Sequence, residues 1–216
     1  MAEYTGNVEV GGPPQARELE RLTITKLAVG PMDNNAYLLE CRASGTALLI
    51  DAANEAPRLI ELLHGRPLDS VLTTHRHGDH WQALAAVVQA TGARTLAHPA
   101  DVDGIPVRTA KAIEDGDQVP VGQAELEIVH LVGHTPGSVA VVYRGDGVHV
   151  FSGDSLFPGG PGRTTSPEDF TTLMDDLEEK VFGRLPDDTW IYPGHGADTT
   201  LGAERPHLSE WRARGW

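Results

Sequence analysis

Cysteine, lysine and long apolar runs are all scarce in this chain of 216 residues. The single cysteine, Cys41, excludes a disulfide within the chain, and its position after the apolar run 36–39 predicts a buried strand residue. No apolar run approaches the roughly 20 residues of a membrane-spanning helix, and the N-terminus lacks the basic start and apolar stretch of a secretory signal. We therefore expect a cytoplasmic protein without a membrane partner.

Basic residues are also few. Seventeen lysines and arginines stand against 31 aspartates and glutamates, so the formal net charge is −14. Such a surface repels phosphate backbones, and we exclude nucleic acid as a partner on this ground. Two bound divalent cations would offset part of the charge. The residues give no indication of the oligomeric state.

The pattern of short apolar runs predicts one globular domain over residues 21–216, preceded by an irregular arm over residues 1–20 that is rich in Gly, Pro and Glu. Helical spacing predicts helices at 55–64, 81–90, 166–180 and 203–212, the third with Ser166 as its N-cap. Two packed sheets with helices outside them fit this order of elements. The β-rich runs that predict strands are 22–29, 36–40, 47–51, 70–73, 95–97, 126–131, 139–143, 148–151 and 190–192.

Four short segments, each expected directly after a strand, contain the chemically active residue types. Strand ends aim side chains from a rigid sheet into a shared rim. A lone His-x-His, a capping aspartate or a loop histidine has an ordinary structural explanation, but five of the ten histidines fall in these segments together. The segments are Thr74-His75-Arg76-His77-Gly78-Asp79-His80, Gly133-His134-Thr135-Pro136-Gly137-Ser138, Ser152-Gly153-Asp154-Ser155 and Pro193-Gly194-His195-Gly196.

These residue types point to metal ions. Histidine and carboxylate are the ligands that zinc accepts where thiolates are absent. His75 and His77, on alternate residues of an extended turn, can share one ion, whereas Asp79 and His80 begin the next helix, point elsewhere and suit a second ion. Two ions roughly 3.5–4 Å apart with a shared water form a known hydrolytic arrangement. The residues available to complete it are His134, His195 and, between the ions, Asp154.

The order of these seven residues resembles the metallo-β-lactamase superfamily, from about Leu22 to the C-terminus. The resemblance implies an α+β fold, the four-layer αββα sandwich, with a dinuclear site at one edge. It implies two divalent ions, zinc before iron or manganese. By the same resemblance the first ion is held by His75, His77 and His134, and the second by Asp79, His80 and His195, with Asp154 as the bridge.

Within the superfamily, segments 133–138 and 152–157 look most like glyoxalase II, the hydroxyacylglutathione hydrolase. The resemblance implies that a metal-bridging hydroxide cleaves an acyl-thioester of glutathione or another low-molecular-weight thiol, with Asp79 orienting the hydroxide and taking its proton. The sequence departs from that enzyme because it lacks the basic helical extension after His195 and the lysine–tyrosine pair in the loop 158–165. The residues predicted to bind the small-molecule substrate instead are Arg163, Arg205 and His207.

Other interpretations stay open. A mononuclear iron persulfide dioxygenase of the same fold would use His75, His134 and Asp154. The loop after Asp154 favours the hydrolase over this alternative. A non-catalytic metal-binding scaffold is a third possibility, against which the complete ligand set argues. A serine esterase reading of Gly153-Asp154-Ser155-Leu156 is disfavoured because that signature normally lies near the N-terminus and here it lies mid-chain.

Overall fold

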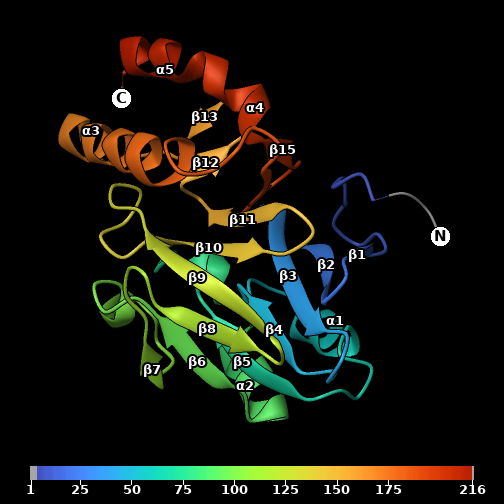
Figure 1. The fold of residues 1–216 in the computed structure, drawn as a ribbon. Helices are drawn as coiled ribbons and strands as arrows, with labels where there is room; N and C mark the ends of the chain where they lie inside the picture. Colours follow the sequence, from blue (N-terminus) through green and yellow to red (C-terminus); the bar gives the residue numbers. More distant parts are fainter. Residues whose placement is uncertain (1–3, 216) are drawn as a thin grey trace.

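The computed structural model describes residues 4–215, which form two β-sheets packed face to face with helices on both outer faces (Figure 1). The first sheet follows the chain order, antiparallel up to β4 and parallel beyond it. Its strands are β1 (Gln15–Glu18), β2 (Leu22–Val29), β3 (Asn34–Cys41), β4 (Ala47–Ile50), β5 (Leu68–Leu72), β6 (Arg94–Ala97) and β7 (Lys111–Ala112).

The second sheet has the order β15-β14-β11-β10-β9-β8, and only β11 and β14 pair in parallel among its described strands. Its strands are β8 (Gln118–Val121), β9 (Ala124–His130), β10 (Val139–Arg144), β11 (Val148–Gly153), β14 (Trp190–Pro193) and β15 (Thr199–Thr200). A separate small ribbon consists of β12 (Leu156–Phe157) and β13 (Gly160–Pro161).

The helices lie on the outer faces of the two sheets (Figure 1). The α-helices are α1 (Ala56–Glu61), α2 (Leu84–Thr91), α3 (Pro167–Asp176), α4 (Leu201–Glu204) and α5 (Leu208–Arg214). The chain adds 3-10 turns at Gly78–His80, Val102–Gly104 and Arg205–His207, and a π-helical segment at Leu177–Phe182. No helix in the described part of the chain has the length and apolarity needed to cross a membrane.

Three apolar clusters define four layers. One lies between the sheets and joins residues such as Ile24 of β2 and Leu126 of β9. A second packs the outer face of the first sheet against α1 and α2, with Leu84 buried in it. The third packs Val150 of β11 against Leu173 of α3. The layers are therefore helix, sheet, sheet and helix, which confirms the predicted αββα sandwich.

Most predicted elements form where the sequence placed them, and the differences have local causes. Residues 15–18, expected in an irregular arm, form the edge strand β1, whose polar sequence hides its pairing with β2. Strand β8 was missed because Pro120 breaks its pattern, which an edge strand tolerates. The last helix is interrupted around Pro206, so it forms α4, a 3-10 turn and α5. Cys41 is fully buried in β3, as predicted.

Removal of the α3 cap provides a test of this local analysis. The Ser166 hydroxyl accepts a hydrogen bond of 3.0 Å from the backbone N–H of Asp169. We expect Ser166→Ala to lower the free energy of unfolding by about 1 kcal/mol, because a helix N–H loses its partner. Urea denaturation measures the change. Ser209→Ala is the matched control, since Ser209 is exposed within α5, and an equal loss in both variants would contradict the assignment.

Candidate metal centre

The four segments singled out in the sequence meet at one edge of the sandwich, because each follows a strand that ends there. His75 and His77 follow β5 of the first sheet, and Asp79 and His80 lie in the 3-10 turn after them. The second sheet supplies the remaining three side chains. These are His134 between β9 and β10, Asp154 after β11 and His195 after β14.

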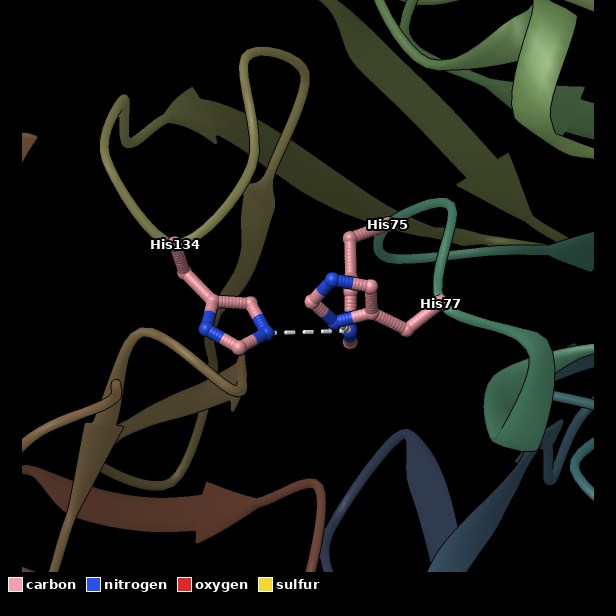
Figure 2. Close-up of side chains that lie close together, drawn as sticks. All are labelled: His75, His77 and His134. Carbon is pink, nitrogen blue, oxygen red and sulfur yellow. Dashed lines mark hydrogen bonds between the residues drawn. The ribbon is translucent and has the colours of Figure 1, made fainter. Parts of the chain in front are cut away.

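One group of three imidazoles converges on a single point. The Nε2 atom of His75 lies 3.1 Å from Nδ1 of His77 and 3.2 Å from Nε2 of His134. Figure 2 shows His75 and His77 extending from one loop toward His134 on the opposite loop. His75 and His134 are buried and His77 is exposed, so the group reaches solvent through His77.

A second group adjoins the first. The Nε2 atoms of His80 and His195 lie 3.3 Å apart, and Oδ2 of Asp79 lies 3.3 Å from Nε2 of His195 and 3.5 Å from Nε2 of His80. The Asn34 side-chain amide donates a 2.9 Å hydrogen bond to Oδ2 of Asp79. Because Asn34 also pairs with His195 through a β-bridge, the first residue of β3 holds two members of this group.

The Asp154 carboxylate lies between the two groups. Its Oδ2 atom is 3.6 Å from Nε2 of His134 and 3.4 Å from Nε2 of His195, and its Oδ1 atom is 3.4 Å from Nε2 of His80. Oδ1 is buried without a hydrogen-bond partner among the described residues. A buried acceptor without a donor is costly. A cation between the groups would satisfy this oxygen and the converging nitrogens, so these residues fit two divalent ions.

The remaining ring nitrogens show which histidine atoms face the site. Nδ1–H of His134 donates to the carbonyl of Arg163 at 2.7 Å, and Nδ1–H of His195 donates to the carbonyl of Met32 at 2.8 Å. A histidine that donates through Nδ1 keeps the lone pair of Nε2 for a metal ion. Both distal histidines are therefore held in the tautomer that a ligand requires.

The Asp51 carboxylate connects both ligand groups, and sequence analysis did not identify it. Its Oδ2 atom accepts 2.8 Å hydrogen bonds from Nδ1–H of His80 and from the Thr74 hydroxyl, and Nδ1 of His75 lies 3.0 Å from that hydroxyl. Asp51 adopts a left-handed backbone with φ 57°. Such a partner orients a ligand and raises its basicity. The available signal was its position directly after β4, at the same sheet edge.

A second buried carboxylate, Asp101, joins the ligand loops of the two sheets. It accepts hydrogen bonds from the backbone N–H of Arg76 at 2.9 Å, the hydroxyl of Thr135 at 2.6 Å and the N–H of Gly137 at 3.0 Å. Arg76 lies between the first two histidine ligands, and Thr135 follows His134. Asp101 thereby fixes the separation of the loops that carry these ligands.

Electrostatics favour the neutral, metal-binding form of His75 and His134 but the protonated form of His80. Burial lowers the pKa of His75 well below its ordinary value, and burial also lowers the pKa of His134, so both imidazoles are neutral. Burial opposes the charged form of His80, but Asp51 and Asp154 outweigh it and raise the pKa of His80 to about 10. A cation must displace the His80 proton, so metal affinity falls as the pH is lowered.

The three predicted substrate-binding residues differ in their surroundings, and only Arg163 contacts a ligand residue, through its carbonyl. Arg163 is exposed and lines a pocket of about 360 Å³ together with Phe170 and Arg214. The Arg205 guanidinium contacts Asp187 and donates to the carbonyls of Phe182 and Leu185 at 2.6 and 3.0 Å.

Those contacts hold the α4–α5 region against the end of the π-helical segment, and they do not support the prediction that Arg205 binds substrate. His207 is exposed and lies 3.2 Å from Glu210. Its role in substrate binding stays a prediction. The Ser155 side chain is buried, which argues against the serine esterase reading.

Comparisons with known proteins agree with this arrangement. A hydroxyacylglutathione hydrolase from Polaromonas sp. is 36% identical over 164 residues, which are 75% of this chain and 62% of that relative, so the chain spans less than two thirds of the relative's length. The crystal structure of ETHE1 from Myxococcus xanthus is 28% identical with a TM-score of 0.75, covering 86% of this chain and 82% of that one. TTHA1623 in a di-iron-bound form is 31% identical with a TM-score of 0.69, covering 83% and 96%.

The family model described as the metallo-beta-lactamase superfamily matches residues 29–195, a range that begins in β2 and ends at His195. It includes most strands of both sheets and every residue of the two ligand groups. From the fold, the converging side chains and this match, the chain belongs to the metallo-beta-lactamase superfamily.

Proposed function

We propose that the protein is a dinuclear metal-dependent hydrolase that cleaves an acyl-thioester of glutathione or another low-molecular-weight thiol. The observation that carries this proposal is the pair of three-residue ligand groups that share the Asp154 carboxylate. The similarity to hydroxyacylglutathione hydrolases supports the thioester as substrate. The net charge of −14 supports a small molecule rather than nucleic acid as partner.

The two ligand groups indicate which residues would hold each ion. His75, His77 and His134 would hold one ion and Asp79, His80 and His195 the other, with Asp154 contacting both. Zinc accepts such nitrogen and oxygen ligands, and iron and manganese are alternatives. Two ions bound there would supply a hydroxide at neutral pH and polarise the thioester carbonyl.

The chain's own residues hold the reacting groups in place. Asn34 donates to Oδ2 of Asp79, and this hydrogen bond, with the nearby His80, outweighs burial and lowers the pKa of Asp79. Asp79 is therefore ionised at neutral pH and can accept a hydrogen bond from the attacking water. We assign it the role of orienting that water and receiving its proton. The Asp51–Thr74 pair keeps His75 and His80 from rotating as the charge on the site changes.

Arg163 is the proposed substrate anchor. Its carbonyl accepts from Nδ1–H of His134, so its backbone is fixed at the metal centre while its side chain extends into the adjacent pocket. A thiol carrier such as glutathione bears carboxylates, and Arg163 and Arg214 place two guanidinium groups around that pocket. We infer that the carrier's carboxylate lies there.

A persulfide dioxygenase with one iron remains the second candidate, and the fold similarity to ETHE1 supports it. It would bind a single ion through His75, His134 and Asp154. Elemental analysis of protein purified without added metal separates the candidates, with about two zinc per chain expected for the hydrolase and about one iron for the dioxygenase. A metal-binding scaffold would hold ions and turn over neither substrate.

Loss of the shared carboxylate tests the metal centre. We expect Asp154→Ala to lose bound metal and activity together, because both groups lose a common anionic ligand. Removing a side chain that only hydrogen-bonds to a metal ligand typically lowers activity roughly 10- to 100-fold. Removing the ligand Asp154 itself should lower activity by more than this. Metal analysis and turnover are measured on the same sample. Asp188→Ala, at an exposed aspartate, is the control, and full metal content with normal turnover in Asp154→Ala would refute the assignment.

Direct assay tests the reaction. We expect the wild-type chain to release free thiol from S-lactoylglutathione or a related acyl-thiol, because the ligand set supports attack on a thioester carbonyl. A thiol-reactive dye detects the product, and Asp154→Ala provides the background rate. Oxygen consumption with glutathione persulfide, together with no cleavage of any acyl-thiol tested, would instead establish the dioxygenase.

Truncation of Arg163 tests the substrate anchor. We expect Arg163→Ala to raise KM about tenfold with little change in kcat, because a charged hydrogen bond made equally in the ground and transition states is lost. Steady-state kinetics with a carboxylate-bearing thioester measure both constants. Arg108→Ala removes an exposed arginine elsewhere and should leave KM unchanged. An unaltered KM in Arg163→Ala toward every charged thioester would exclude this anchor.

A further inference from the structure

A buried lysine lies behind the second ligand group. Lys26 of β2 is completely buried, and its ammonium donates three hydrogen bonds, to Oδ1 of Asp198 at 2.6 Å, to the carbonyl of Gly6 at 2.6 Å and to the carbonyl of Gly196 at 2.7 Å. These use all three donors of the ammonium group. A buried charge requires such complete pairing, because its desolvation is otherwise too costly.

Both oxygens of the Asp198 carboxylate also have hydrogen-bond donors. Oδ2 of Asp198 accepts from the Tyr4 hydroxyl at 2.7 Å and from Nε1–H of Trp190 at 2.9 Å, and the side chain is 1% exposed. Gly6 adopts φ 76°, and a Cβ atom there would lie 2.5 Å from Asp198. The segment Tyr4–Gly6 therefore packs directly onto the ion pair. This places part of the predicted irregular arm in a defined contact.

The ion pair adjoins a metal ligand. Gly196, whose carbonyl Lys26 holds, directly follows His195 in the chain. The Asn35 amide donates to the same carbonyl and to that of Pro193, both at 2.9 Å, and the Tyr37 hydroxyl donates to the Pro193 carbonyl at 2.6 Å. The backbone on both sides of His195 is thus fixed from the first sheet.

No comparable contact joins Lys26 to the first ligand group within the described residues. The rings of that group are held by Thr74 and by the carbonyl of Arg163. The two proposed ions therefore depend on different supports, and only the second depends on the contact between β2, the N-terminal segment and the loop 193–196.

We propose that Lys26 and Asp198 are positioning residues for His195, and that they set the affinity of the second metal ion without setting that of the first. The inference rests on the proposed dinuclear centre. Partners of metal ligands typically contribute 10- to 100-fold in affinity, and a loop that shifts by a fraction of an ångström loses this contribution. The segment Tyr4–Gly6 covers the ion pair, so it contributes to the affinity of the same metal ion.

Zinc titration in competition with a chromophoric chelator tests the inference. The variant is Lys26→Met combined with Asp198→Asn, because neutralising both members of a buried ion pair is often tolerated, whereas removing one leaves a bare charge. We expect the first zinc to bind as in the wild-type chain and the second to bind roughly 10- to 100-fold more weakly. Thermal unfolding of the metal-free protein establishes that the variant is folded.

Two further variants complete the experiment. Lys180→Met is the matched control, since Lys180 also bonds one carboxylate, that of Asp176, and one carbonyl, that of His130, but contacts no residue of the loop 193–196. It should leave the second zinc affinity unchanged. Tyr4→Phe removes one hydrogen bond to Asp198 while both charges remain, so it keeps the test valid if the double variant does not fold. Tyr4→Phe should lower the affinity for the second zinc ion alone, and by less than the double variant does.

The outcomes show whether the proposed dinuclear centre or the proposed role of Lys26 and Asp198 is wrong. A wild-type chain that binds fewer than two zinc ions would contradict the proposed dinuclear centre. A wild-type chain with two zinc ions would overturn the role of Lys26 and Asp198 if the folded double variant, or Tyr4→Phe in its place, kept both affinities. Equal weakening of both ions would overturn it too, because the effect would then be general rather than directed at His195.

Discussion

The packing of the two sheets against one another is the constraint on which the metal centre depends. The first sheet and its loops supply His75, His77, Asp79 and His80, while the second supplies the other three proposed ligands. Neither sheet alone brings a complete set together. The apolar cluster between the sheets therefore positions the ligands as well as stabilising the fold. A shift of one sheet relative to the other would separate His134 from His75. Rigid strands on both sides hold the ligands to within the fractions of an ångström that such a site requires.

Buried carboxylates outside the ligand set extend this constraint to individual side chains. Asp51 reaches both groups at once, through His80 directly and through Thr74 to His75. Asp101 joins the loops of the two sheets. Each carboxylate accepts several short hydrogen bonds, which compensate for its burial and restrain its position. The acidic composition of the chain is thus partly explained inside the molecule, where anions support the cation site.

The two arginines predicted to bind substrate, Arg163 and Arg205, have different surroundings in the fold. The guanidinium of Arg205 contacts Asp187 and the carbonyls of Phe182 and Leu185, and these contacts hold the C-terminal helices in place. Arg163 differs because its own backbone supports His134. Because its carbonyl contacts a ligand residue and its side chain lines the neighbouring pocket, Arg163 would couple the proposed substrate binding to the metal centre.

The sequence by itself determined the fold class and the seven proposed ligands. Strand and helix periods are local properties, and histidines flanked by glycine after successive strands form a pattern that no single structural role explains. Tertiary structure alone decided what holds the ligands. Asp51, Asp101 and the Lys26–Asp198 pair act through contacts between residues 23 to 172 positions apart, and a lone aspartate or lysine gives no local signal of such a contact. For the same reason, sequence patterns did not predict strand β1 or the partners of Arg205. The pairing of an edge strand and the partners of a guanidinium depend on residues that are neighbours in space.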